Sequence, residues 1–254
     1  MGGLGLAGGS LAATPKQAMR MTGLLASVTS PDEAVLALEA GADILDCKDP
    51  TRGALGALGV PVIRDIVGRV RGRVPVSATV GDLPTDAAAL LPAVRRIGAT
   101  GVDFVKLGFL RSTGISDVIA ALAPLTPSHS LIAVLFADHS PDWEVIPDLA
   151  AAGFAGIMLD TAAKGGDTLL DLLSTDALRD FVHQSRRHGL LCGLAGSLRL
   201  SQIETLLPLQ PDYLGFRGAL CEQGRTSRLS RNACTQIRTT IPTARGSQHH
   251  TDAA

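Results

Sequence analysis

The chain has 254 residues, a net charge of −1 and 46% hydrophobic residues. This length suits one large α/β domain or two small ones, and the charge leaves no basic patch of the kind that binds nucleic acid. No apolar run approaches the ~20 residues of a membrane-spanning helix, so neither nucleic acid nor a membrane is expected as a partner. Only 3% of the residues are aromatic, which leaves Leu, Ile, Val and Ala to build the core.

The two ends of the chain lack a core pattern. The segment Met1 to Ala18 is rich in Gly and Ala but has no basic region followed by a continuous apolar stretch, which argues against a signal peptide. We expect disordered ends at residues 1–22 and 242–254 and a single domain over residues 23–241. The four cysteines are scattered, so no zinc site or disulfide framework is predicted and a reducing cytoplasm fits best.

Eight short apolar runs predict buried parallel strands. In chain order they are Gly23 to Val28, Ala42 to Lys48, Val74 to Gly81, Val102 to Gly108, Leu131 to Asp138, Gly156 to Asp160, Leu190 to Ala195 and Tyr213 to Arg217. Amphipathic stretches between them predict helices. These are Asp32 to Ala40, Val60 to Arg71, Ala87 to Ile97, Ser116 to Leu122, Trp143 to Ala152, Thr175 to His188 and Gln202 to Leu207.

The first repeat shows how sequence marks the element boundaries. Ser30 suits a helix cap, Pro31 suits the first helical turn, and Gly41 ends the helix just before the next strand. Eight strands alternating with helices in about 200 residues predict a TIM (β/α)8 barrel, near the lower size limit of that fold. A doubly wound open sheet is the alternative. No G-x-G-x-x-G follows the first strand, which weakens a dinucleotide-binding interpretation.

The lysines carry the strongest chemical signal. The chain has four lysines, its other 19 basic residues are arginine, and Lys48, Lys106 and Lys164 each follow an apolar run. In a barrel the active site lies at the carboxyl ends of the strands. Alternation along a strand places Asp46 and Lys48 on one face, and Asp160 ends the sixth run. We therefore expect three amines and two carboxylates to converge.

Such a cluster suits Schiff-base chemistry. Burial and neighbouring cations favour the neutral form of an amine, which can attack a carbonyl, whereas guanidinium stays charged. Carboxylates can then move the protons that iminium chemistry requires. The alternative interpretation is that these residues form structural ion pairs at the mouth of the barrel.

A phosphate site is predicted after the seventh and eighth strands, where barrels often have one. Gly196 and Gly218 would let backbone N–H groups approach an anion, Ser197 can donate a hydrogen bond, and Arg217 can fork two hydrogen bonds to phosphate. The alternative is that both glycines merely shape turns.

Other polar residues give weaker signals. Ser77 and Thr79 end the third run and are candidates for substrate contact, although a turn capped by Asp82 fits as well. Asp138 and His139 follow the fifth run, where the start of a helix is the favoured interpretation. No His, Asp and Glu residues have the spacing of metal ligands, and the sequence has no G-x-S-x-G elbow. We therefore predict no metal and no cofactor.

Seven segments in order resemble the (5-formylfuran-3-yl)methyl phosphate synthase family, over most of the chain from about Leu24 to Cys221. The D-x-K-x-P-x-x-G-x-L-G-A block is the most specific. The segments are Asp46-Cys47-Lys48-Asp49-Pro50, Arg52-Gly53-Ala54-Leu55-Gly56-Ala57, Val76-Ser77-Ala78-Thr79-Val80-Gly81-Asp82, Val105-Lys106-Leu107-Gly108, Met158-Leu159-Asp160-Thr161-Ala162-Ala163-Lys164, Leu194-Ala195-Gly196-Ser197 and Arg217-Gly218-Ala219.

The resemblance implies a TIM barrel similar to class I aldolases that makes a furan phosphate, a precursor of methanofuran or a related one-carbon carrier, from two molecules of glyceraldehyde 3-phosphate. It implies that Lys48 forms the Schiff base and that Asp46, Lys106, Asp160 and Lys164 complete the active site. The chain departs from the family at Asp49, where Asn is common, after the fifth strand and in its N-terminal extension.

Two other functions stay open at this point. One is a class I aldolase with a different phosphorylated aldehyde as acceptor, and the other is a non-catalytic barrel that binds phosphosugars. In each case the partner is a small phosphorylated molecule. The Leu and Ala faces of the helices suit the core or subunit contacts alike, so a homo-oligomer also stays open.

Overall fold

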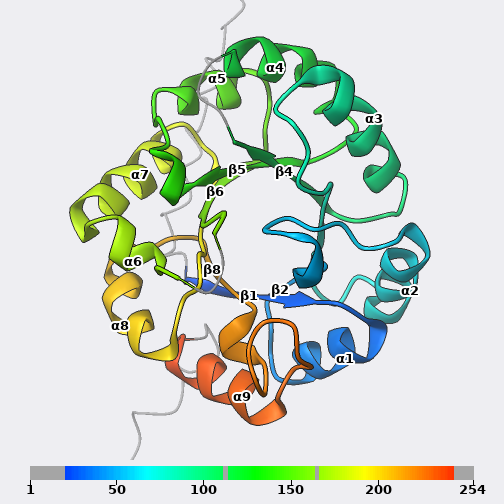
Figure 1. Cartoon of the computed structure of the whole chain (residues 1–254), viewed down its shortest axis with the longest axis vertical. Coiled ribbons are helices and arrows are strands. Elements are labelled where there is room, and N and C mark those ends of the chain that lie inside the picture. The colour runs from blue at the N-terminus through cyan, green and yellow to red at the C-terminus, as the bar shows by residue number, and fades with distance from the viewer. Residues whose placement is uncertain (1–20, 111–113, 164–165, 243–254) are drawn as a thin grey trace, which may run out of the picture.

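The computed structural model describes residues 21–110, 114–163 and 166–242, and these residues form a closed eight-stranded parallel barrel surrounded by helices (Figure 1). Each strand pairs with the next, and β8 pairs with β1. The strands are β1 Gly23–Val28, β2 Ile44–Cys47, β3 Val76–Thr79, β4 Phe104–Phe109, β5 Leu131–Phe136, β6 Gly156–Asp160, β7 Leu191–Leu194 and β8 Tyr213–Phe216. The predicted TIM barrel is confirmed, and the open sheet is excluded.

The helices are α1 Pro31–Glu39, α2 Val60–Val70, α3 Ala87–Gly98, α4 Ile115–Leu122, α5 Val145–Ala151, α6 Leu169–Leu172, α7 Thr175–Arg187, α8 Ile203–Leu206 and α9 Arg231–Thr240. Two of them, α6 and α9, are absent from the sequence-based prediction. Several predicted strands are too long by two to four residues, at one end or at both. No helix in the described part of the chain is long and apolar enough to cross a membrane.

The predicted ends of the domain are only partly visible. Of the two segments predicted to be disordered, residues 1–20 and 243–254 lie outside the described residues. Thr22 is anchored, since its buried hydroxyl donates to the carbonyl of Pro211 at 2.8 Å.

Apolar side chains fill two separate spaces. One large cluster lies between the barrel and its helices and includes Cys47, which the alternation along β2 turns away from the barrel interior. A second cluster occupies the barrel itself and includes Leu25, Ile132 and Phe136. Leu55 belongs to this inner cluster although it lies in the loop between β2 and α2. Figure 1 shows that loop crossing the opening of the barrel.

Asp82 fixes this loop. Its carboxylate accepts the backbone N–H groups of Ala54 and Leu55, each at 2.7 Å, while Thr79 donates its hydroxyl to the carbonyl of Gly56 at 3.0 Å. Gly53 has φ +103°, and a Cβ atom there would collide with the Asp82 carboxylate. The cap predicted for the turn at Asp82 is thus corrected, because its carboxylate bonds the loop after β2 instead. This contact positions Leu55 as one wall of the barrel mouth.

We expect Asp82→Ala to free this loop. Loss of the carboxylate leaves two backbone N–H groups without their acceptor, at a cost of about 2 kcal/mol. Hydrogen exchange of residues 49–59 should then become faster by about 10-fold or more. Asp86→Ala is the matched control, because it removes an exposed carboxylate that caps α3 through the N–H of Ala89. Unchanged protection of the loop in Asp82→Ala would contradict this role.

Candidate active site

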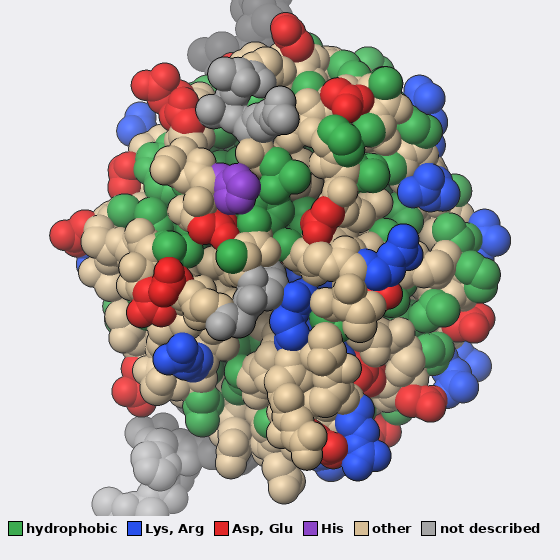
Figure 2. Space-filling view, viewed as in Figure 1, with side chains coloured by type: hydrophobic (Ala, Val, Ile, Leu, Met, Phe, Trp, Pro, Cys, Tyr) green, Lys and Arg blue, Asp and Glu red, His purple; other side chains and the backbone are tan. Residues whose placement is uncertain are grey.

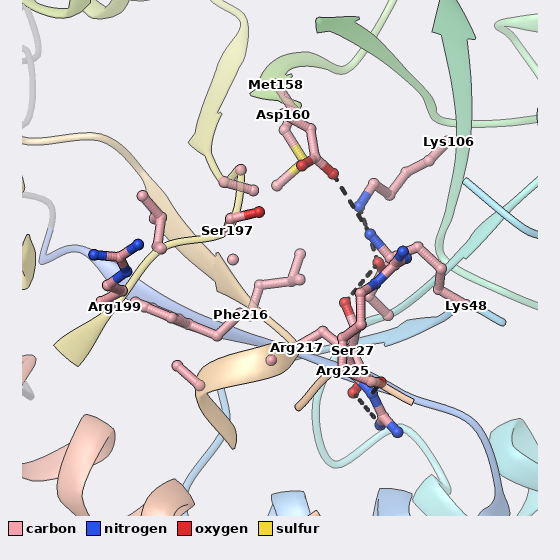
Figure 3. A pocket seen from close by; sticks show the side chains of 18 of the residues that line it. Ser27, Lys48, Lys106, Met158, Asp160, Ser197, Arg199, Phe216, Arg217 and Arg225 are labelled. Atoms are coloured by element: carbon pink, nitrogen blue, oxygen red, sulfur yellow. Dashed lines mark hydrogen bonds and ion pairs between the residues drawn. The ribbon is translucent and has the colours of Figure 1, made fainter. Parts of the chain in front are cut away.

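Two lysines and two aspartates meet inside the barrel. Lys48 directly follows β2, and its Nζ lies 3.5 Å from Oδ2 of Asp160 at the end of β6. Lys106 lies within β4, and its Nζ donates to Oδ2 of Asp46 at 3.1 Å. All four are buried, and Figure 3 shows Lys48, Lys106 and Asp160 pointing toward one another. The convergence predicted from alternate strands is present for these four residues.

The strand register explains how Asp46 is held. Ser27 of β1, Asp46 of β2 and Ser77 of β3 are aligned across the sheet, so their side chains enter the barrel at one level. Asp46 accepts hydrogen bonds from Ser77 Oγ at 2.6 Å and Ser27 Oγ at 3.2 Å. The sequence analysis did not predict Ser27 as a site residue, although a single hydroxyl in the otherwise apolar run of β1 could have indicated one.

Opposing effects set the charge of Asp46. Burial would raise the pKa of this carboxyl, but the charges of Lys106 and Lys48 and the hydrogen bond from Ser77 outweigh burial and hold the pKa below its ordinary value. Asp46 is therefore a carboxylate at neutral pH.

Lys106 shows the reverse balance. Burial lowers its pKa, the neighbouring charge of Lys48 adds to this, and the carboxylates of Asp46 and Asp160 only partly offset the loss. An amine with a lowered pKa can give up or accept a proton more easily near neutral pH. Lys106 lies deeper than the strand end assigned to it from the sequence, because the apolar run of β4 continues to Phe109.

A cavity of about 340 Å³ opens above these side chains, toward the loops that follow β7 and β8. Gly196, Ser197 and Gly218 border it, as predicted. Gly196 and Ser197 both have positive φ, 107° and 51°. Within the described chain, no protein acceptor is found for their backbone N–H groups or for that of Gly218. Figure 2 shows basic and acidic side chains near the centre of this face.

Three predicted site residues are placed differently or not at all. Ser77 and Thr79 do not border the cavity: Ser77 donates to Asp46, and Thr79 holds the loop carbonyl of Gly56. Their predicted contact with substrate is therefore corrected to support of Asp46 and of the loop. Lys164 lies outside the described residues. Asp138 accepts the N–H groups of Ala162 and Ala163, at 2.9 and 2.7 Å, and so shapes the segment after β6.

Comparison with known families decides the assignment. The family model for 4-HFC-P synthase matches residues 24–238, nearly the whole barrel. The chain belongs to this family. The resemblance noted from the sequence is thereby confirmed, and all four of the clustered side chains lie within the matched region.

Curated relatives agree with the 4-HFC-P synthase family. A protein of Methanopyrus kandleri named (5-formylfuran-3-yl)methyl phosphate synthase is 36% identical over 217 residues, which cover 81% of this chain and 92% of that protein. A relative from Methylorubrum extorquens, provisionally given the same name, is 48% identical over 198 residues, covering 78% of this chain and 82% of that protein.

Solved structures resemble this family member in fold alone. Phosphoribosyl anthranilate isomerase from Thermus thermophilus superimposes with a TM-score of 0.59 at 16% identity, covering 86% of this chain and 98% of that one. KGPDC from Streptococcus mutans gives a TM-score of 0.60 at 11% identity over 87% and 98% of the two chains. Both support the TIM barrel assignment.

Arg217 corrects one prediction for this 4-HFC-P synthase family member. The residue borders the cavity, but all five N–H donors of its guanidinium have protein acceptors. Two go to the Glu33 carboxylate, at 2.6 and 3.2 Å, and three go to backbone carbonyls of residues 27, 225 and 227. The fork predicted for phosphate is thus occupied by Glu33 of α1.

We expect Glu33→Gln to destabilise the fold by about 3 kcal/mol at pH 7, since it leaves a buried guanidinium without its counter-ion. Burial alone would raise the pKa of Glu33, but Arg217 and Thr29 together lower it from its ordinary value of 4.5. The stabilisation is thus complete above pH 4.5 and is lost as the pH falls through the lowered pKa. Urea unfolding at pH 7 and pH 3 should show the difference between wild type and variant shrinking in acid.

Among the described residues, no group of three or more His, Cys, Asp or Glu side chains is arranged to hold a metal ion. Cys47 packs outside the barrel, where burial and the charge of Asp46 raise the pKa of its thiol.

Proposed function

We propose that the protein is a (5-formylfuran-3-yl)methyl phosphate synthase that condenses two molecules of glyceraldehyde 3-phosphate through a Schiff base on Lys48. The observation that carries this proposal is the paired arrangement of two buried lysines with two carboxylates beneath a cavity, in a chain of this family. Family membership favours the reaction, and the geometry supplies groups that suit it.

The first step is capture of the aldehyde. The amine of Lys48 gives up a proton and attacks the carbonyl carbon, and water leaves to give an iminium ion. We assign to Asp160, 3.5 Å from the Lys48 amine, the role of accepting and returning the protons of this step. Removal of the proton next to the iminium carbon then gives an enamine.

The second step forms the carbon skeleton. The enamine carbon attacks the carbonyl of the second triose phosphate, and the new alkoxide is stabilised by Lys106, whose own charge is balanced by Asp46. Ring closure, loss of one phosphate and hydrolysis from Lys48 follow. Two triose phosphates less one phosphoric acid and two waters give the product formula, so no oxidant or reductant is required.

Trapping with borohydride tests the proposal. The protein is incubated with glyceraldehyde 3-phosphate and borohydride, and the adduct is located by intact mass and peptide mapping, while the furan is followed by absorbance and identified by mass. An adduct on Lys48 together with the furan phosphate is the expected result. An adduct without furan would assign the protein to another aldolase reaction, and neither adduct nor product would indicate a barrel that only binds phosphosugars.

A further inference from the structure

Arg217 holds the loop between β8 and α9 in place, and its donors are not available to bind a ligand. Its Nε donates to the carbonyl of Arg225 and its Nη2 to that of Ser227, both at 2.8 Å. A backbone bridge between Cys221 and Leu229 closes the base of the same loop. The backbone of Arg225 is therefore fixed at the rim of the cavity.

The side chain of Arg225 borders that cavity and is half-buried. In the described part of the chain its guanidinium makes one hydrogen bond, from Nη2 to the carbonyl of Gly53 at 2.9 Å, and no carboxylate lies within 4.0 Å of it. Burial lowers the pKa of Arg225, and the more distant charges of Asp160 and Asp82 oppose this. The group keeps its positive charge, with most of its five donors unused.

The other cations at the cavity are less suited to an anion. Lys48 and Lys106 are paired with carboxylates, and Arg217 is fully hydrogen-bonded. Arg199 is exposed, and Figure 3 shows it on the side of the cavity away from the two lysines. Arg225 is thus the cation at the cavity that lies near the lysine cluster and has neither a counter-ion nor a full set of acceptors among the described residues.

We propose that Arg225 binds the phosphate group of the substrate from one side, while the backbone N–H groups of Gly196 and Ser197 bind it from the other. A guanidinium fork matches two phosphate oxygens, and consecutive N–H groups in a left-handed turn form a concave anion site. This assignment rests on the proposed function for the identity of the substrate, and it replaces Arg217 by Arg225 as the cation that recognises phosphate.

The variants Arg225→Gln and Arg225→Lys test this role, with Arg228→Gln as the matched control. Arg228 lies on the same loop, is 80% exposed at its side chain and pairs with Glu222 at the surface. Binding of inorganic phosphate and glycerol 3-phosphate is measured by calorimetry on proteins whose melting temperatures have been compared. Borohydride capture is measured in parallel with glyceraldehyde 3-phosphate and with unphosphorylated glyceraldehyde.

We expect Arg225→Gln to weaken phosphate binding and capture of the triose phosphate by about 10- to 100-fold, the effect of losing charge-assisted hydrogen bonds. Arg225→Lys should recover part of the loss, and Arg228→Gln should match wild type. Capture of unphosphorylated glyceraldehyde should be unchanged. Equal losses with both aldehydes, or full phosphate binding by Arg225→Gln, would overturn the assignment, as would wild-type protein that binds no phosphate.

The two proposals fail in different ways. If the protein makes no furan, calorimetry still reports whether Arg225 binds phosphate, and the variants are compared on that measurement alone. If furan forms at the wild-type rate in Arg225→Gln, the synthase stands and the role of Arg225 is refuted.

Discussion

Replacing Lys48 with Ala is expected to abolish the borohydride-stable adduct and to lower furan formation by at least about 10³-fold. The reason is positional. Both amines border the cavity, but Lys48 is held less closely, 3.5 Å from Asp160, whereas Lys106 lies 3.1 Å from Asp46 and is more deeply buried. We therefore expect that Lys106 does not replace Lys48. The measurement is peptide mapping after reduction, combined with the furan assay.

Lys48→Arg separates charge from nucleophilicity. Guanidinium keeps the positive charge beside Asp160 but does not act as a nucleophile. We expect it to fold as wild type does and to be as inactive as Lys48→Ala. An adduct that moves to Lys106 with furan formation retained in either variant would refute the assignment of the Schiff base to Lys48.

The second large effect is expected for Asp46→Asn, which removes the counter-ion of a fully buried lysine. We expect a loss of about 3 kcal/mol in the free energy of unfolding at pH 7 and a fall in furan formation of about 10²- to 10⁴-fold. Ser77→Ala is the control, because it removes one neutral hydroxyl from Asp46 and should cost about 1 kcal/mol.

The pH dependence of Asp46→Asn gives a further readout. Without Asp46, the pKa of Lys106 falls further below its ordinary value of 10.5, because the carboxylate is among the groups that raise it. In the variant, the pH range in which the unfolded chain binds more protons than the folded chain is therefore wider. Because stability rises with pH in that range, the variant should gain stability relative to wild type as the pH rises toward 10.5. A constant difference between wild type and variant from about pH 6 to about pH 10 would contradict the coupling of these two residues.

The sequence was sufficient for the parts of the site that lie on strands. Alternation along β2 correctly placed Asp46 and Lys48 inside the barrel and Cys47 outside it. Apolar runs bounded by helix caps likewise predicted the closed barrel, because buried parallel strands and their helices have distinct periodicities. These features depend on neighbours within a few residues.

Contacts between segments that lie far apart in the chain could not be predicted from the sequence. Arg217 was predicted to bind phosphate because nothing local shows that Glu33 fills its fork from α1. Arg225 gave no signal, since it lies in a loop whose course depends on Arg217. The same limit applies to Thr79, whose acceptor lies in the loop after β2.

The ion pair of Glu33 and Arg217 joins residues 184 positions apart, across the seam where β8 meets β1. Closing so long a segment has an entropic cost that contacts within a single strand–helix repeat do not offset. The ion pair of Glu33 and Arg217 should therefore form only when β8 docks against β1. The loop that holds Arg225 is fixed by the same arginine, because Arg217 also donates to the carbonyls of Arg225 and Ser227. During synthesis Lys48 and Lys106 can therefore be in place before Arg225 is positioned. We expect activity to appear only when β8 docks against β1. A chain that lacks the last strand should have no partial activity.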